Sequence, residues 1–122
     1  MDKEEEALVW LDLEMSGLDF TKDRILELAL VLTDWRLNPL SSSLHFSLHC
    51  EESVLSQMDA WCLSHHRESG VYQRSLLSQI SVEEAEQKVL DFLQACPFSV
   101  FCLAGNSVHM DRLFLKKWMP QF

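Results

Sequence analysis

The chain has 122 residues, of which 48% are hydrophobic and 24% charged, and 19 acidic against 10 basic residues give a formal charge of −9. This length fits a single domain over 1–122, and the hydrophobic content is too high for an intrinsically disordered protein. The sequence has no run of about 18 apolar residues, which excludes a transmembrane helix. Its few clustered bases do not favour binding to long duplex nucleic acid.

Cellular location is indicated by the first residues and by the cysteines. The start at 1–6 is acidic, whereas signal and transit peptides have a basic or Arg-rich leader. The four cysteines show no metal-ligand spacing and are predicted to be reduced thiols: Cys50, Cys62, Cys96 and Cys102. We therefore expect a cytoplasmic protein, with a mitochondrial location left open.

Three strands are predicted in the first part of the chain. The apolar run 8–13, interrupted by Asp12, is typical of a buried strand, and a turn follows at 16–19. The segment 25–33 is rich in Leu, Ile and Val, while 44–48 alternates apolar and polar residues. Short turns between these segments indicate an antiparallel meander.

Helices dominate the prediction for the rest of the chain. One or two helices are expected in 51–66 and a short one in 71–77. Ser81 and Glu84 form a capping-box pattern that opens a helix reaching about residue 96. A fourth strand at 99–103 and a last helix at 108–119 complete a mixed α/β domain, with strand four parallel to strand one.

Two acidic residues, Asp12 and Glu14, are the first candidate site. They lie two apart in a predicted strand, so their side chains share one face, with Cα atoms about 6.6 Å apart. Like charges so close repel each other unless a cation lies between them or one carboxyl is protonated. A strand end that emerges into solvent is the structural alternative.

Asp111 supplies a third acidic group. In the last helix it shares a stripe with Val108, Leu115 and Trp118, beyond the first turn, on the face that should pack inward. A buried carboxylate without a partner is costly. If this helix packs beside strands one and four, three acids converge and favour a pair of Mg²⁺ or Mn²⁺ ions, as in two-metal phosphodiester cleavage.

Four segments together resemble the oligoribonuclease family, 3′-to-5′ exoribonucleases of the DEDD superfamily, DEDDh type. The segments are VWLDLEMSGLD at 9–19, DRILELA at 23–29, MDAW at 58–61 and GNSVHMDRLFL at 105–115. The resemblance implies a ribonuclease H-like fold, use of Mg²⁺ or Mn²⁺, and a homodimer that degrades short single-stranded RNA, dinucleotides above all.

The resemblance also implies a role for each matching residue. Asp12, Glu14 and Asp111 would be catalytic metal ligands. Leu18 would be a wedge between two bases and Trp61 a surface on which a base stacks, while His66 and Ser107 would approach the phosphate end. The structural alternative makes Leu18 and Trp61 ordinary core residues and His66 an exposed loop residue.

One departure from the family pattern affects activity. The family pattern continues with a general-base His and, five residues later, a fourth acid, whereas the sequence here runs to Phe122 and lacks both. A fifth strand and the family's dimer contacts would also lie beyond this point. We therefore expect a sheet truncated before strand five, an open edge at strand four, poor stability, impaired hydrolysis and no assured homodimer.

Two further functions stay open on the sequence. One is a non-catalytic truncated relative that binds a short nucleotide or a partner subunit. The other is an interaction module that binds no nucleotide and in which the acids are surface groups.

Overall fold

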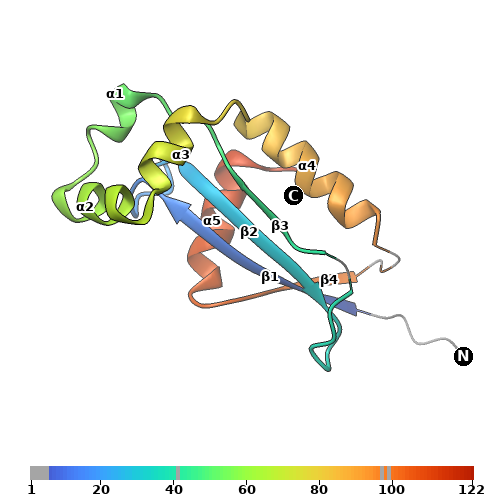
Figure 1. Ribbon diagram of the computed structural model, residues 1–122. Helices are drawn as coiled ribbons and strands as arrows, with labels where there is room; N and C mark the ends of the chain where they lie inside the picture. The colour runs from blue at the N-terminus through green and yellow to red at the C-terminus, as the bar shows by residue number, and fades with distance from the viewer. Residues whose placement is uncertain (1–5, 41, 97, 99) are drawn as a thin grey trace, which may run out of the picture.

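A four-stranded mixed sheet forms the centre of the protein (Figure 1). The structure, a computed structural model, describes residues 6–40, 42–96, 98 and 100–122. β1 (Glu6–Met15), β2 (Ile25–Thr33) and β3 (Leu44–Ser47) are antiparallel neighbours, and β4 (Val100–Ala104) pairs with β1 in parallel. The strand order is β3-β2-β1-β4, which confirms the predicted meander and the parallel fourth strand.

Five helices are present in the described parts of the chain, and they occupy different places around the sheet. α1 (Glu52–Leu55), α2 (Ala60–Ser69) and α3 (Val71–Leu77) gather at the end where β1 finishes (Figure 1). α4 (Val82–Gln94) and α5 (Val108–Trp118) flank β4 in the chain. None of these helices has the length and apolarity to cross a membrane.

The core lies between one face of the sheet and the last two helices. Val9, Leu11 and Leu13 alternate along β1 and are buried in a cluster that also contains Val89 of α4 and Phe114 of α5. Because side chains alternate along a strand, the residues between them point to the opposite face. That opposite face carries the first two acids of the candidate site.

Helix ends explain most differences from the predicted bounds. The segment predicted at 51–66 contains two helices, because the Asp59 side chain accepts a hydrogen bond from the backbone N–H of Cys62 and caps α2. α2 then continues to Ser69, where Gly70 adopts a left-handed conformation with φ 89°. The capping box of Ser81 and Glu84 is confirmed, and α4 ends slightly early, at Gln94.

The start of α5 requires one correction. The helix begins at Val108, so Asp111 lies in its first turn rather than beyond it. Ser107 precedes the helix with a left-handed φ of 52°, and its side chain makes no capping hydrogen bond. The last helix therefore starts from a tight backbone turn, with its inward-facing acid close to the helix start.

Candidate functional site

Asp12 and Glu14 project from the last part of β1. Their cross-strand partners on β2 are Ala29 and Glu27. The pairing of β1 with β4 ends at Trp10, so β1 continues past its parallel neighbour. Asp12 is exposed and Glu14 partly buried. The same-face placement predicted from their spacing agrees with the strand pairing.

Asp111 reaches the same region from α5. Its side chain is buried, and the nearby backbone N–H of Leu13 has a small lowering effect on its pKa. Burial and the negative charges of Asp12 and Glu14, against the opposing effect of His109, together raise the pKa of Asp111 to about 6. The helix carboxylate is thus close enough to both strand acids to feel their charge, as the inward stripe on the helix predicted.

Among the described residues, no ion pair neutralises this group of three acids, which we call the acidic trio. Both ion pairs among the described residues involve Glu27, which lies outside the trio. The exposed His109 acts in the opposite direction to the two strand acids and lowers the pKa of Asp111. Carboxylates whose negative charge has no positive partner fit Mg²⁺ or Mn²⁺, because their oxygen atoms are hard donors.

A cleft of about 330 Å³ opens beside Asp12. Its lining includes Trp10 and Val31 on the sheet face and Gly105 and Asn106 from the loop between β4 and α5. Gly105 has φ 142°, and a Cβ there would lie 2.6 Å from the carbonyl oxygen of Leu11. A glycine is needed at this position because the loop passes so close to β1.

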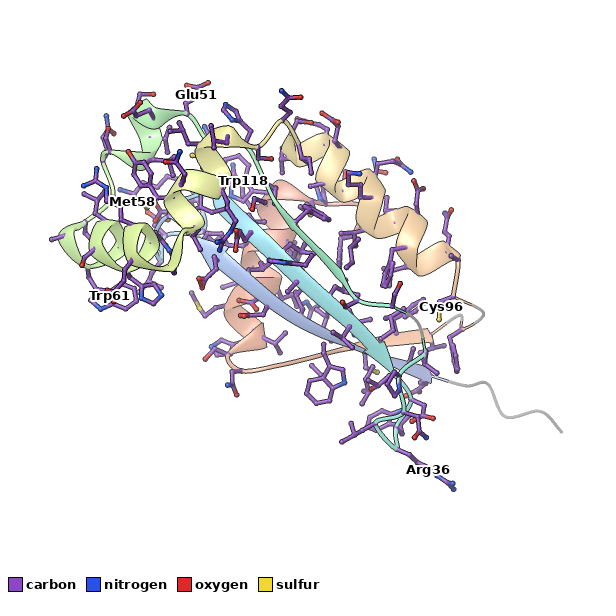
Figure 2. The ribbon with its side chains drawn as sticks, in the orientation of Figure 1. Arg36, Glu51, Met58, Trp61, Cys96 and Trp118 are labelled. Atoms are coloured by element: carbon purple, nitrogen blue, oxygen red, sulfur yellow. The ribbon has the colours of Figure 1, made fainter. Side chains whose placement is uncertain are left out.

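Leu18 and Trp61 both lie on the surface. Leu18 is 80% exposed in the turn after β1, and Trp61 is 69% exposed. Trp61 lies in the first turn of α2, at the edge of the molecule in Figure 2. The alternative that they are ordinary core residues is therefore wrong. Ser107 is also exposed, at the start of α5. All three side chains are accessible to a ligand.

The environment of His66 differs from the exposed loop that the structural alternative assumed. It is a buried residue of α2, not an exposed loop residue, and its Nε2 lies 2.7 Å from the carbonyl oxygen of Met15. A carbonyl oxygen only accepts hydrogen bonds, so Nε2 carries a proton and a neutral ring presents a bare Nδ1. Contact with a phosphate oxygen would require a second proton on the ring.

Two neighbours of the predicted site residues were missed from the sequence. His65 stacks on Trp61 with ring centroids 4.7 Å apart, a contact that the i, i+4 spacing in a helix could have indicated. Glu27 is buried beside Glu14 and bound by Arg74, which follows it by 47 residues. No local pattern could have shown that second pair.

Comparisons with known proteins show the family of the chain. A family model described as Exonuclease matches residues 9–122. The chain is 44% identical over 123 residues to a protein of Dictyostelium discoideum named "Probable oligoribonuclease", covering all of this chain and 65% of that protein. It is 42% identical over 118 residues to the human mitochondrial oligoribonuclease, covering 96% of this chain and 50% of that one.

A solved structure shows the same fold. The nuclease domain of 3′hExo, a DEDDh family member crystallised with rAMP, superposes with a TM-score of 0.67 at 17% identity over 99% of this chain and 62% of that one. This match confirms the ribonuclease H-like fold. The chain spans between half and about two thirds of the length of the two relatives.

Proposed function

Because the chain belongs to the DEDD exonuclease family of the oligoribonucleases, we propose that its acidic trio is the metal-binding part of a 3′-to-5′ exoribonuclease site for short oligoribonucleotides. The observation that carries the proposal is the buried Asp111, whose pKa is raised to about 6 through burial and through the charge of Asp12. A divalent cation would offset both causes. Asp12, Glu14 and Asp111 would hold Mg²⁺ or Mn²⁺.

The chemistry divides between the ions and the protein. Bound divalent ions would stabilise the negative charge that develops on the phosphodiester during hydrolysis. The protein's part is to fix three carboxylates on two elements, β1 and α5, which pack together through the core that contains Leu13 and Phe114. At neutral pH a carboxyl group with a pKa of about 6 is mostly ionised and ready to bind a cation.

Substrate length would be set by the exposed apolar side chains. Leu18 and Trp61 offer a wedge and a stacking surface for two bases, and stacking on an aromatic ring is worth about 1–3 kcal/mol per base for any sequence. Ser107 offers a hydroxyl at the start of α5. Such contacts suit a dinucleotide or another short single strand.

The 122 residues by themselves are proposed to hydrolyse slowly. The general-base His and the fourth acid implied by the family resemblance are not among them, and general-base assistance contributes about 10²–10⁴-fold to a rate. A cytoplasmic location is proposed on the four cysteines, which are all free thiols.

Hydrolysis of a labelled diribonucleotide with Mn²⁺ tests the proposal. We expect slow release of mononucleotide by the wild-type chain and at least a 100-fold lower rate for Asp12→Ala. Asp91→Ala, which removes an exposed acid of α4, is the matched control and should keep the wild-type rate. Equal rates for wild type and Asp12→Ala would contradict the catalytic role.

Calorimetry with an unlabelled dinucleotide and Ca²⁺ distinguishes the alternative function. Tight binding that Trp61→Ala weakens, without product in the Mn²⁺ assay, would favour a non-catalytic nucleotide-binding protein. Binding together with slow turnover supports the exonuclease.

A further inference from the structure

A second group of potential ligands lies beside the acidic trio. A carboxylate oxygen of Glu14 and one ring nitrogen each of His65 and His66 lie within 4.8 Å of one another. Glu14 comes from β1 and the histidines from α2, so two separate elements contribute. This group differs from the trio in kind, because two of its three donors are nitrogen atoms.

His66 carries an unsatisfied atom that points to a missing ligand. Its side chain is only 3% exposed, and its Nε2–H donates to the carbonyl oxygen of Met15. The other nitrogen, Nδ1, is buried and has no hydrogen-bond partner among the described residues. A buried acceptor without a partner is destabilising, so a ligand that accepts this lone pair would be stabilising.

The surroundings of the two rings favour a metal ion as that ligand. Metal-binding histidines usually donate their second ring N–H to a backbone carbonyl or a carboxylate, which sets the tautomer and the ring orientation. The contact between His66 and Met15 has this form already. The ring of His65 stacks on Trp61, with planes 12° apart.

We propose that Glu14, His65 and His66 form a Zn²⁺ site that shares only Glu14 with the Mg²⁺ or Mn²⁺ site of the acidic trio. Two imidazoles and one carboxylate are a ligand set that Zn²⁺ favours, with a fourth position for water or a ligand. Mg²⁺ prefers oxygen donors and should not compete well here. Tetrahedral Zn²⁺ places its ligand atoms about 3.3 Å apart. Rotation of the exposed His65 and the partly buried Glu14 would close the group.

The shared residue couples the two sites. Glu14 belongs both to this group and to the acidic trio, so Zn²⁺ would withdraw a carboxylate from the trio. This consequence rests on the proposed function: Zn²⁺ should inhibit hydrolysis by competing for Glu14. The Zn²⁺ site itself depends only on the ligand group and is tested by binding.

Titration of the metal-free 122-residue chain with Zn²⁺ by calorimetry tests the site. We expect one Zn²⁺ per chain, at least tenfold weaker binding for His65→Ala, and unchanged binding for His49→Ala, which removes another exposed histidine. Asp111→Asn should retain Zn²⁺ binding because it alters only the trio. Wild-type affinity in His65→Ala, or loss of binding in Asp111→Asn, would overturn the proposal.

Imidazole nitrogen NMR tests His66 without a substitution at a buried position. In the metal-free wild-type chain, Nδ1 of His66 should be unprotonated and Nε2 protonated, and Zn²⁺ should shift the Nδ1 resonance. A His66 signal that Zn²⁺ leaves unchanged would contradict the site.

The Mn²⁺ hydrolysis assay with added Zn²⁺ separates this proposal from the proposed function. Inhibition that His65→Ala relieves supports both proposals. Zn²⁺ binding that His65→Ala weakens, with no hydrolysis in any variant, supports the Zn²⁺ site and contradicts the exonuclease.

Discussion

Two buried carboxylates on the same domain have opposite electrostatic environments. Burial raises the pKa of Glu27, but hydrogen bonds from Arg74 and Ser47 outweigh it and hold that pKa below its ordinary value. Arg74 Nε lies 2.5 Å and Ser47 Oγ 2.7 Å from the Glu27 carboxylate. For Asp111, burial together with the charge of Asp12 raises the pKa to about 6.

The difference separates a structural acid from a ligand. Glu27 and Asp111 are 5% and 6% exposed, so burial alone does not distinguish them. The fold provides a guanidinium and a hydroxyl for Glu27, which fasten α3 and β3 to β2. It provides Asp111 with one backbone N–H and two negative neighbours. Because the charge of Asp111 has no such partner, a cation from the solvent would stabilise Asp111 more than Glu27.

Arg74→Met should produce the largest change in stability, because it leaves Glu27 buried without its main partner. We expect the free energy of unfolding to fall by about 3 kcal/mol. This value is at the low end of the range for buried ion pairs that lose one partner, because Arg74 is half exposed. Denaturant unfolding measures it. Lys88→Met, at an exposed position of α4, is the control and should stay within about 0.5 kcal/mol. A loss no greater than the control's would mean that Glu27 needs no cation.

Asp111→Asn should change stability in the other direction. Without divalent ions at pH 7.5, the neutral side chain removes repulsion and the burial of a charge, and we expect a gain of about 2 kcal/mol. Denaturant unfolding in a chelating buffer measures this gain. Destabilisation of the same size would show that the Asp111 charge is already compensated.

The pH dependence checks the sign of both effects. The pKa of Asp111 is about 6 in the folded chain, above its ordinary value of 3.8, so the folded state binds more protons between these values. Stability should therefore rise by about 1 kcal/mol as pH falls from 7 to 5, and Asp111→Asn should abolish that rise. Glu27 acts oppositely, because its stabilisation is present above 4.5 and is lost as pH falls through its lowered pKa.

The limits of sequence-based prediction follow from this comparison. β2 was predicted with its observed bounds, and the inward position of Asp111 followed from helix periodicity, because both depend on neighbours within a few residues. The Arg74 partner of Glu27 depends on how α3 meets the sheet. The burial of His66 likewise depends on contact with Met15, 51 residues away. Local patterns carry no information on such contacts.

The edge strand shows the same limit. β4 lies at the edge of the described sheet, and its residues are all partly buried. The predicted open edge agrees with this topology. Poor stability and association of the chain remain predictions.

Thermal unfolding with and without Mg²⁺ tests the central claim most directly. If the acidic trio binds hard divalent cations, Mg²⁺ should raise the melting temperature of the wild-type chain and of His65→Ala, and should have no effect on Asp111→Asn. A melting temperature of the wild-type chain that saturating Mg²⁺ leaves unchanged, or an equal rise in Asp111→Asn, would contradict the claim.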